Sequence, residues 1–254
     1  MDLGLKGKKV IMNGGSHGIG FAALKTFAAE GADVAFFSGN ADRLGTARDA
    51  IDAAGSGKVF AEVFDMSNDP AGYKAWLTKA VAELGGCDIF VHTASTSGQS
   101  ATGDWQRTLD MDIMGAVHAA EVLTGPLTEC KSGSIVLMSS TAAVETFIAP
   151  QAFNAMKAAL ITYGAQLGQA LAPMGIKVNC VSPGAVEYLG GNWEWIKENM
   201  KEFYDGTLAQ ITMGRFGEPQ EIANVIVFVA SPACPYMTGT NVVIDGGLTK
   251  RVQF

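Results

Sequence analysis

A glycine-rich segment near the start of the chain has the residue types and spacing of a phosphate-binding loop. Gly14, Gly18 and Gly20 follow the pattern Gly-x3-Gly-x-Gly, between an apolar run and a helical pattern. Glycine lets the backbone approach a pyrophosphate closely, and a helix that begins there presents free amides and the positive end of its dipole. The segment therefore predicts nucleotide binding rather than an ordinary strand-to-helix turn. Further contacts with the nucleotide are expected from Ser16, His17 and Ile19.

The end of the second apolar run indicates which dinucleotide would be bound. An acidic residue there would hydrogen-bond the ribose of NAD, whereas a basic residue would favour NADP. This chain has Ser38-Gly39-Asn40, with Arg43 one helical turn further. Because nothing acidic stands there, we expect NADP to be preferred to NAD, with Ser38 and Asn40 among its contacts. These two residues are also compatible with a role in shaping the turn, and Arg43 with a solvated position.

The elements that must position these residues alternate between strand and helix. Short apolar runs predict seven strands, at 10–12, 34–37, 59–64, 89–91, 135–138, 176–181 and 242–244. Helical spacing predicts helices at 18–30, 41–54, 68–83, 104–130, 151–171, 192–210 and 218–230, the fourth of them broken near Gly125-Pro126. Continuous apolar strands separated by helices are typical of a parallel sheet with helices on both faces. We therefore expect one domain over 1–254, a doubly wound α/β Rossmann fold with an insertion at 188–212.

Composition excludes several other classes of protein. The net charge is −7 with no basic run, so neither a nucleic acid nor a membrane is an expected partner. No apolar run approaches the roughly 20 residues of a membrane span, and the first residues predict no signal peptide. The four cysteines form no metal or disulfide pattern, so we expect no metal site and a cytoplasmic location. Charged residues are only 17% of the chain, which favours buried subunit interfaces.

Further motifs, spread over essentially the whole chain, resemble those of the short-chain dehydrogenase/reductase family. They are the glycine loop, Asp65, Asp88-Ile89-Phe90-Val91, Ser139-Ser140, the segment 153–157, Ser182-Pro183-Gly184, the segment 214–219, Thr238-Gly239 and Asp245-Gly246-Gly247. The resemblance implies an NAD(P)-dependent oxidoreductase that moves hydride between a nicotinamide cofactor and a secondary alcohol or ketone, and a homotetramer. The cofactor contacts that it implies beyond the glycine loop are Asp65, Met66, Ala94, Lys157, Pro183, Gly184 and Val186.

The same resemblance implies roles for the residues of the reaction centre. In the family a serine orients the substrate oxygen, a tyrosine gives or takes the proton, and a lysine lowers the pKa of that tyrosine and holds the nicotinamide ribose. Ser140 and Lys157 match the serine and the lysine. The tyrosine position, four residues before the lysine, is Phe153. The position of the asparagine that supports the lysine is Asp112, either an ion-pair partner of Lys157 or a solvated helix residue.

Two loops also depart from the family pattern. The usual Asn-Asn-Ala-Gly after the fourth strand is His92-Thr93-Ala94-Ser95, and the threonine after the Pro-Gly turn is replaced near Tyr188. The segment 188–212 resembles the family's substrate lid. Its aromatic residues favour an apolar or cyclic ketone, and the expected substrate contacts beside Ser140 are Tyr188, Trp193 and Trp195.

Phe153 has no proton to donate, and loss of a positioned general acid typically costs about 10²–10⁴ in rate. Three explanations are open. The chain is an engineered variant that traps a complex, it is a natural binder that has lost catalysis, or another group supplies the proton, Tyr188 first. Retention of the other motifs favours an active parent crippled by this residue. The alternative function is a non-catalytic NAD(P)-binding protein, a redox sensor or scaffold; a lyase without cofactor is disfavoured.

Overall fold

The computed structural model of the chain describes residues 1–67, 69–96, 103–146 and 150–252. Over these residues, seven strands form one sheet in the order β3-β2-β1-β4-β5-β6-β7, and every neighbouring pair is parallel. The strands are β1 Lys9–Asn13, β2 Asp33–Ser38, β3 Val59–Val63, β4 Ile89–His92, β5 Gly133–Met138, β6 Ile176–Pro183 and β7 Asn241–Ile244. The expected doubly wound Rossmann fold is confirmed.

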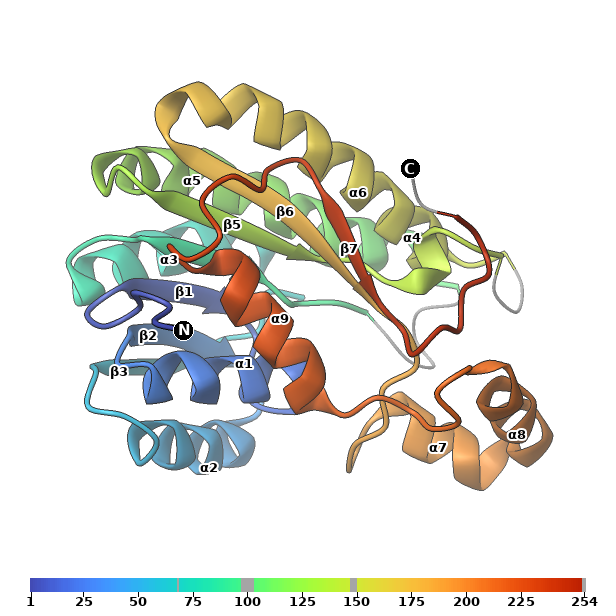
Figure 1. Cartoon of the computed structure of the whole chain (residues 1–254). Helices are drawn as coiled ribbons and strands as arrows, with labels where there is room; N and C mark the ends of the chain where they lie inside the picture. The colour runs from blue at the N-terminus through green and yellow to red at the C-terminus, as the bar shows by residue number, and fades with distance from the viewer. Residues whose placement is uncertain (68, 97–102, 147–149, 253–254) are drawn as a thin grey trace.

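Helices cover both faces of the sheet, because strands buried on both sides need two apolar cores. On one face lie α1 Gly18–Ala29, α2 Ala41–Asp52 and α9 Pro219–Ala230, and on the other α3 Pro70–Leu84, α5 Gly115–Glu129 and α6 Ala152–Leu171 (Figure 1). Two short helices, α7 Asn192–Asn199 and α8 Lys201–Gln210, form a separate lobe beside the sheet with a small core of their own (Figure 1).

The predicted break near Gly125-Pro126 is wrong. Helix α5 continues through Pro126 to Glu129. The proline removes the one hydrogen bond that its own N–H would have donated, but the flanking Leu123 and Leu127 are fully buried and their packing keeps the helix continuous. The irregularity lies earlier in the predicted helix. A short helix, α4 Trp105–Thr108, is followed by a π-helical turn, η2 Leu109–Met114, and only then by α5.

The predicted helix 192–210 is also wrong as a single element. Met200 is extended out of helical geometry, at φ −139° and ψ 53°, and it ends α7 and precedes α8. Folding the segment back on itself stacks Trp193 on Phe203, with ring centroids 5.9 Å apart. In a continuous helix these two side chains would lie about 15 Å apart along the axis and could not stack. The aromatic stacking therefore stabilises the break between α7 and α8.

Candidate active site

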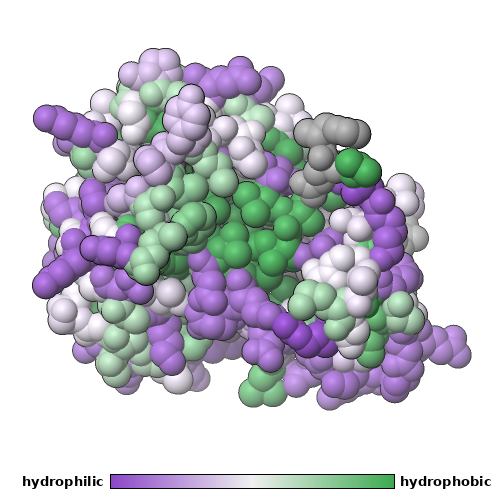
Figure 2. All heavy atoms as spheres, viewed as in Figure 1, coloured by the Kyte–Doolittle hydropathy of each residue, from purple (hydrophilic) through white to green (hydrophobic). Residues whose placement is uncertain are grey.

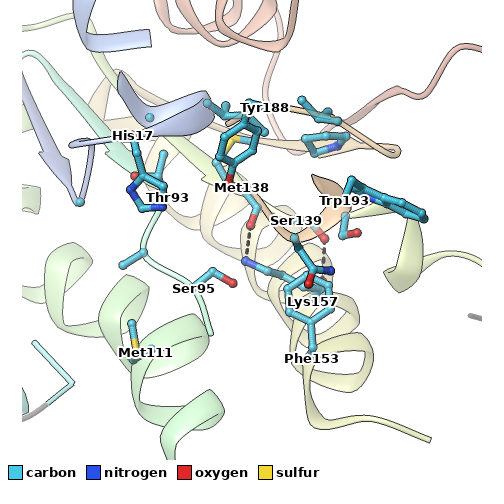
Figure 3. A pocket seen from close by; sticks show the side chains of 18 of the residues that line it. His17, Thr93, Ser95, Met111, Met138, Ser139, Phe153, Lys157, Tyr188 and Trp193 are labelled. Carbon is cyan, nitrogen blue, oxygen red and sulfur yellow. Dashed lines mark hydrogen bonds between the residues drawn. The ribbon is translucent and has the colours of Figure 1, made fainter. Parts of the chain in front are cut away.

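A cavity of about 520 Å³ opens at the carboxyl ends of the strands, where the strand order reverses between β1 and β4. Most of the residues predicted from the sequence line it (Figure 3). They are Gly14, Ser16, His17, Ile19, Gly20, Ser38, Asp65, Met66, Ala94, Ser140, Phe153, Lys157, Pro183, Gly184, Val186, Tyr188, Trp193 and Trp195. Gly18, Asn40 and Asp112 are the predicted residues that are absent from its lining.

The glycine loop has the shape of a cradle for a phosphate group. Gly14 and Gly18 have φ values of +84° and +56°, which favour glycine. A Cβ on Gly20 would lie 3.0 Å from the Cα of Gly15, so the loop folds too closely for a side chain. No side chain caps the start of α1, and its first amides therefore face the loop. These features fit the pyrophosphate of a dinucleotide.

Tyr188 lies against this loop. A Cβ on Gly18 would fall 2.6 Å from the Tyr188 ring, and the ring of His17 is 6.2 Å from it, centroid to centroid. Burial raises the pKa of the Tyr188 hydroxyl. Tyr188, a predicted substrate contact, therefore lies over the phosphate-binding loop. Its ring covers Gly18, which explains why Gly18 is absent from the cavity lining.

The residues after β2 divide between two roles. Ser38 hydrogen-bonds Ser16 through their hydroxyls at 2.9 Å and lines the cavity. Asn40 accepts the amide of Arg43 at 2.8 Å and caps α2, so it shapes the turn, and its expected cofactor contact is not supported. Burial first, and the positive charge of Arg43 second, lower the pKa of His17.

Lys157 is buried at the opposite end of the cavity. Its ammonium forms an ion pair with Asp112, with 2.8 Å between Nζ and Oδ1, and the side chains are only 2% and 0% exposed. The ammonium also donates to the Met138 carbonyl at 2.7 Å and lies 5.6 Å from the centroid of the Phe153 ring (Figure 3). The ion-pair alternative for Asp112 is confirmed, and the solvated alternative is wrong.

Asp112 lies behind Lys157, on the π-helical turn that the sequence did not reveal. Its Oδ1 also accepts the Ser95 hydroxyl at 2.7 Å, and its Oδ2 accepts the Thr96 amide at 3.0 Å and hydroxyl at 3.1 Å. Burial by itself would raise the pKa of this carboxyl. Lys157 and the hydrogen bonds outweigh burial, so the pKa stays below its ordinary value and the group is charged.

A second buried network joins β1 to β4, and sequence reasoning did not find its key member, Asn13. The Asn13 side-chain oxygen accepts the amides of Thr93 and Ala94, so its nitrogen donates to His92 Nδ1 at 2.6 Å. This assigns the imidazole proton to Nε2, which donates to the Asp112 carbonyl at 3.1 Å. Burial and the Lys157 charge lower the pKa of His92 to about 4, so it is neutral. The signal in the sequence was a polar residue at the end of an apolar strand.

The two serines after β5 differ in role. Ser139 donates its hydroxyl to the Lys157 carbonyl at 2.9 Å and fixes the start of α6 against the sheet. The Ser140 oxygen accepts the Ala142 amide at 3.1 Å. No described residue accepts the Ser140 hydroxyl hydrogen, so it can be donated to a ligand in the cavity.

The outer wall of the cavity is apolar and comes largely from the lobe of α7 and α8. Its residues are Trp193, Trp195, Ile196, Met200 and Leu248, with Met111 from the η2 turn. Trp193 packs on Phe216 with ring centroids 4.9 Å apart, which anchors the lobe. Across the described residues we find no cluster of His, Cys, Asp and Glu fit to hold a metal, and no helix long and apolar enough to cross a membrane.

Comparisons with known proteins agree with this geometry. A family model described as enoyl-(acyl carrier protein) reductase matches residues 14–249. Isoepoxydon dehydrogenase of Penicillium expansum is 31% identical over 99% of this chain and 98% of its own, and 3-oxoacyl-[acyl-carrier-protein] reductase of Chlamydia pneumoniae is 31% identical over 98% and 100%.

Solved structures show the same architecture. L-sorbose reductase of Gluconobacter frateurii, in complex with NADPH and L-sorbose, matches with a TM-score of 0.87 and 28% identity over 99% of this chain and 100% of its own. A short-chain dehydrogenase/reductase of Serratia marcescens matches with a TM-score of 0.84 and 31% identity over 96% and 99%. Together with the strand order, the glycine loop and the placement of Ser140 and Lys157, these matches show that the chain belongs to the short-chain dehydrogenase/reductase family of oxidoreductases.

Proposed function

We propose that the chain binds a nicotinamide dinucleotide and catalyses hydride transfer between it and a secondary alcohol or ketone. The observation that carries this proposal is one continuous cavity that joins the glycine loop to Ser140 and Lys157. The dinucleotide, when bound, supplies or accepts the hydride. Gly14, Gly18 and Gly20 would hold its phosphates, and Lys157, Pro183 and Gly184 the nicotinamide half. Ser140 would orient the substrate oxygen through its hydroxyl hydrogen.

We propose NADP as the preferred cofactor. Ser38 ends β2 without an acidic neighbour on that strand end, and the Arg43 charge lies near enough to affect His17. A 2′-phosphate would gain from this charge, whereas the ribose of NAD would lack its usual carboxylate partner. We expect calorimetry to give at least about tenfold tighter binding of NADPH than of NADH, equivalent to about 1.4 kcal/mol. Arg43→Ala should remove most of the difference and Arg48→Ala should not. Equal affinities in the unaltered chain would refute the preference.

The substrate class is a neutral, apolar or cyclic ketone or the matching alcohol. The outer wall of the cavity presents two indoles and aliphatic side chains, and Lys157, the ammonium in the lining, is already paired with Asp112. Among the described lining residues, a phosphorylated or carboxylated substrate would find no cation that lacks a carboxylate partner. Relatives named for activity on ring compounds, such as the 3-alpha-(or 20-beta)-hydroxysteroid dehydrogenase of Mycobacterium tuberculosis at 30% identity, support this choice.

A second candidate function is a non-catalytic dinucleotide-binding protein, a redox sensor or scaffold, and Phe153 is the observation that favours it. Cofactor binding is common to both candidates. Turnover of a panel of cyclic and aromatic ketones, followed by NADPH absorbance, separates them. Oxidation of NADPH that depends on one of the ketones supports the enzyme. Tight NADPH binding without turnover, in this chain and in forms with the phenol restored, would leave the binding protein.

We also propose a homotetramer in a reducing compartment such as the cytoplasm. Figure 2 shows a hydrophobic area at the centre of the viewed face, where β7 and α9 lie in Figure 1. Strand β7 is the edge of the sheet, and its Val242, Val243 and Ile244 are only half-buried. An apolar edge strand is normally covered by a partner.

The proposed reducing compartment rests on the cysteines. All four are free thiols: Cys87, Cys130, Cys180 and Cys234.

A further inference from the structure

Three positions at which this chain departs from the family pattern contact one another around Lys157. Asp112 Oδ1 accepts hydrogen bonds from both Lys157 Nζ, at 2.8 Å, and the Ser95 hydroxyl, at 2.7 Å. The Phe153 ring lies on another side of the same ammonium, 5.6 Å away. Figure 3 shows the Ser95 hydroxyl and the end of the Lys157 side chain pointing toward one another. A single inactivating change at Phe153 would not account for the other two departures.

We propose that Lys157 itself donates the proton to the substrate oxygen, and that Asp112 and Ser95 position Lys157 and return its proton from solvent. This inference rests on the proposed oxidoreductase function. Under this proposal, Phe153, Asp112 and Ser95 act together, and Phe153 is not an isolated inactivating substitution.

The geometry leaves one N–H of the ammonium available. An ammonium has three N–H groups. The described residues accept two of them, through the Met138 carbonyl and Asp112 Oδ1. Lys157 lines the cavity, and Phe153 places no hydroxyl between the ammonium and a substrate. The third N–H has no acceptor among the described residues, and Lys157 and Ser140 line the same cavity, so this N–H is the one assigned to a substrate oxygen held by Ser140.

The proton balance follows from the contacts. The dinucleotide, when bound, would supply the hydride to the carbonyl carbon. At Lys157 the Nζ–H bond would break, an O–H bond would form on the substrate oxygen, and the electron pair would stay on Nζ. The Asp112 carboxylate is then buried opposite a neutral amine, which is unfavourable. Ser95 lines the cavity and can take a proton from solvent there while its own proton passes to Asp112 Oδ1. Asp112 passes a proton on to Nζ and restores the ion pair.

Asp112 also determines what a restored phenol would do. A carboxylate 2.8 Å from Nζ offsets most of the field that the ammonium exerts at position 153. A phenol introduced there would therefore keep an ordinary or raised pKa. Asp112→Asn would leave the charge of Lys157 without a carboxylate partner and would lower the pKa of the introduced phenol.

A titration of the protein without cofactor tests this step. The introduced phenol is followed by its ultraviolet absorbance at alkaline pH, as the difference between Phe153→Tyr and the unaltered chain. We expect ionisation near or above pH 10, and a fall of at least about one pKa unit when Asp112→Asn is added. Asp110→Asn, on the same turn, is the matched control and should leave the titration unchanged. The other titratable groups facing Lys157 are His92 from β4 and the Cys180 thiol from β6, and neither is altered. A phenol already depressed in the single variant would overturn the charge-offset argument.

Steady-state kinetics with NADPH and cyclic ketones test the catalytic step. The unaltered chain should turn over, and Lys157→Met should lose at least about 100-fold in kcat. Ser95→Ala should lower kcat about tenfold with little change in KM, and Ser95→Thr should recover it. Phe153→Tyr alone should gain less than about tenfold, whereas Phe153→Tyr added to Asp112→Asn should gain at least about 100-fold over Asp112→Asn.

Two failures are distinguishable. If the unaltered chain is inert while Phe153→Tyr with Asp112→Asn turns over, the site is an oxidoreductase site but Lys157 does not donate, and the inference is overturned. If both forms bind NADPH and neither reduces any ketone, the proposed function itself fails, and the inference fails with it. A gain of 100-fold or more in kcat from Phe153→Tyr alone would show that Phe153 merely removes the proton donor. That result would also overturn the inference.

Discussion

At the scale of single residues, Gly18 shows how backbone conformation and packing act on the same position. Its φ is +56°, and a Cβ would lie 2.6 Å from the Tyr188 ring. Gly18→Ala should therefore displace Tyr188 or the loop and weaken NADPH binding at least about tenfold by calorimetry. Gly45→Ala is the matched control, because a Cβ on this glycine of α2 meets nothing within 4 Å. Unchanged NADPH affinity in Gly18→Ala would contradict the proposed role of the loop.

The Lys157–Asp112 pair also makes a prediction about stability. Removing one partner of a buried ion pair leaves the other charge unpaired, so Asp112→Ala should lower the free energy of unfolding at pH 7 by about 3–5 kcal/mol. The pKa of Asp112 is lower in the folded chain than in the unfolded one, so the unfolded chain binds more protons in acid. The contribution of Asp112 is therefore present above the ordinary carboxyl pKa and is lost as the pH falls through the folded value.

Urea unfolding of both forms between pH 7 and pH 3 measures this contribution. The stability of the unaltered chain should fall toward that of Asp112→Ala as the solution is acidified. Asp110→Ala, which removes a carboxylate from the same π-helical turn without breaking the pair, should cost less than about 1 kcal/mol. A constant gap between the unaltered chain and Asp112→Ala over the whole range would show that the carboxylate charge contributes nothing.

At the scale of elements, the end of α9 depends on a lysine from a distant strand. The Lys177 ammonium on β6 donates to the carbonyls of Val229, Ser231 and Cys234 at 2.8, 2.7 and 2.7 Å. The last carbonyls of a helix have no partner within it, and positive charge is favourable at that end. One side chain therefore joins α9 and the segment after it to strand β6, next to the edge of the sheet.

Lys177→Met keeps the aliphatic part of the side chain and removes all three hydrogen bonds. We expect a loss of about 2–4 kcal/mol in the free energy of unfolding, from partly buried carbonyls left without a donor. Lys25→Met, at an exposed position on α1, is the control and should change stability by less than about 0.5 kcal/mol. Equal stability of the two variants would mean that water replaces the lysine at no cost.

At the scale of the whole molecule, the apolar face formed by β7 and α9 predicts association (Figure 2). Light scattering at micromolar concentration should give four times the chain mass of 26.5 kDa. Val243→Lys places a charge on the edge strand and should shift the mass toward smaller species, because a buried unpaired charge opposes the contact. A monomeric mass for the unaltered chain would reject the tetramer.

Most of the strands and helices, and the chemistry of the glycine loop, could be predicted from the amino-acid sequence alone. Alternation of short apolar runs with helical spacing is a local property, and it predicted the parallel sheet before any contact was known. The glycines at 14, 18 and 20 reveal a phosphate loop because backbone freedom belongs to the residue type. The side chain of Phe153 has no acidic proton to donate, whatever fold surrounds it.

Which polar residues contact one another could be learned only from the folded chain. Nothing local distinguishes Asp112 from Asp110 two residues earlier, yet one is buried against Lys157 and the other bonds Gln106 near the surface. Both residues belong to the same π-helical turn, η2, and α6, which begins some 40 residues later, packs against this turn and supplies Lys157 to Asp112 alone. Asn13 bonds His92 across 79 positions of sequence for the same reason. Burial and pairing depend on contacts between distant segments, and such contacts form only when the sheet and both helix layers come together.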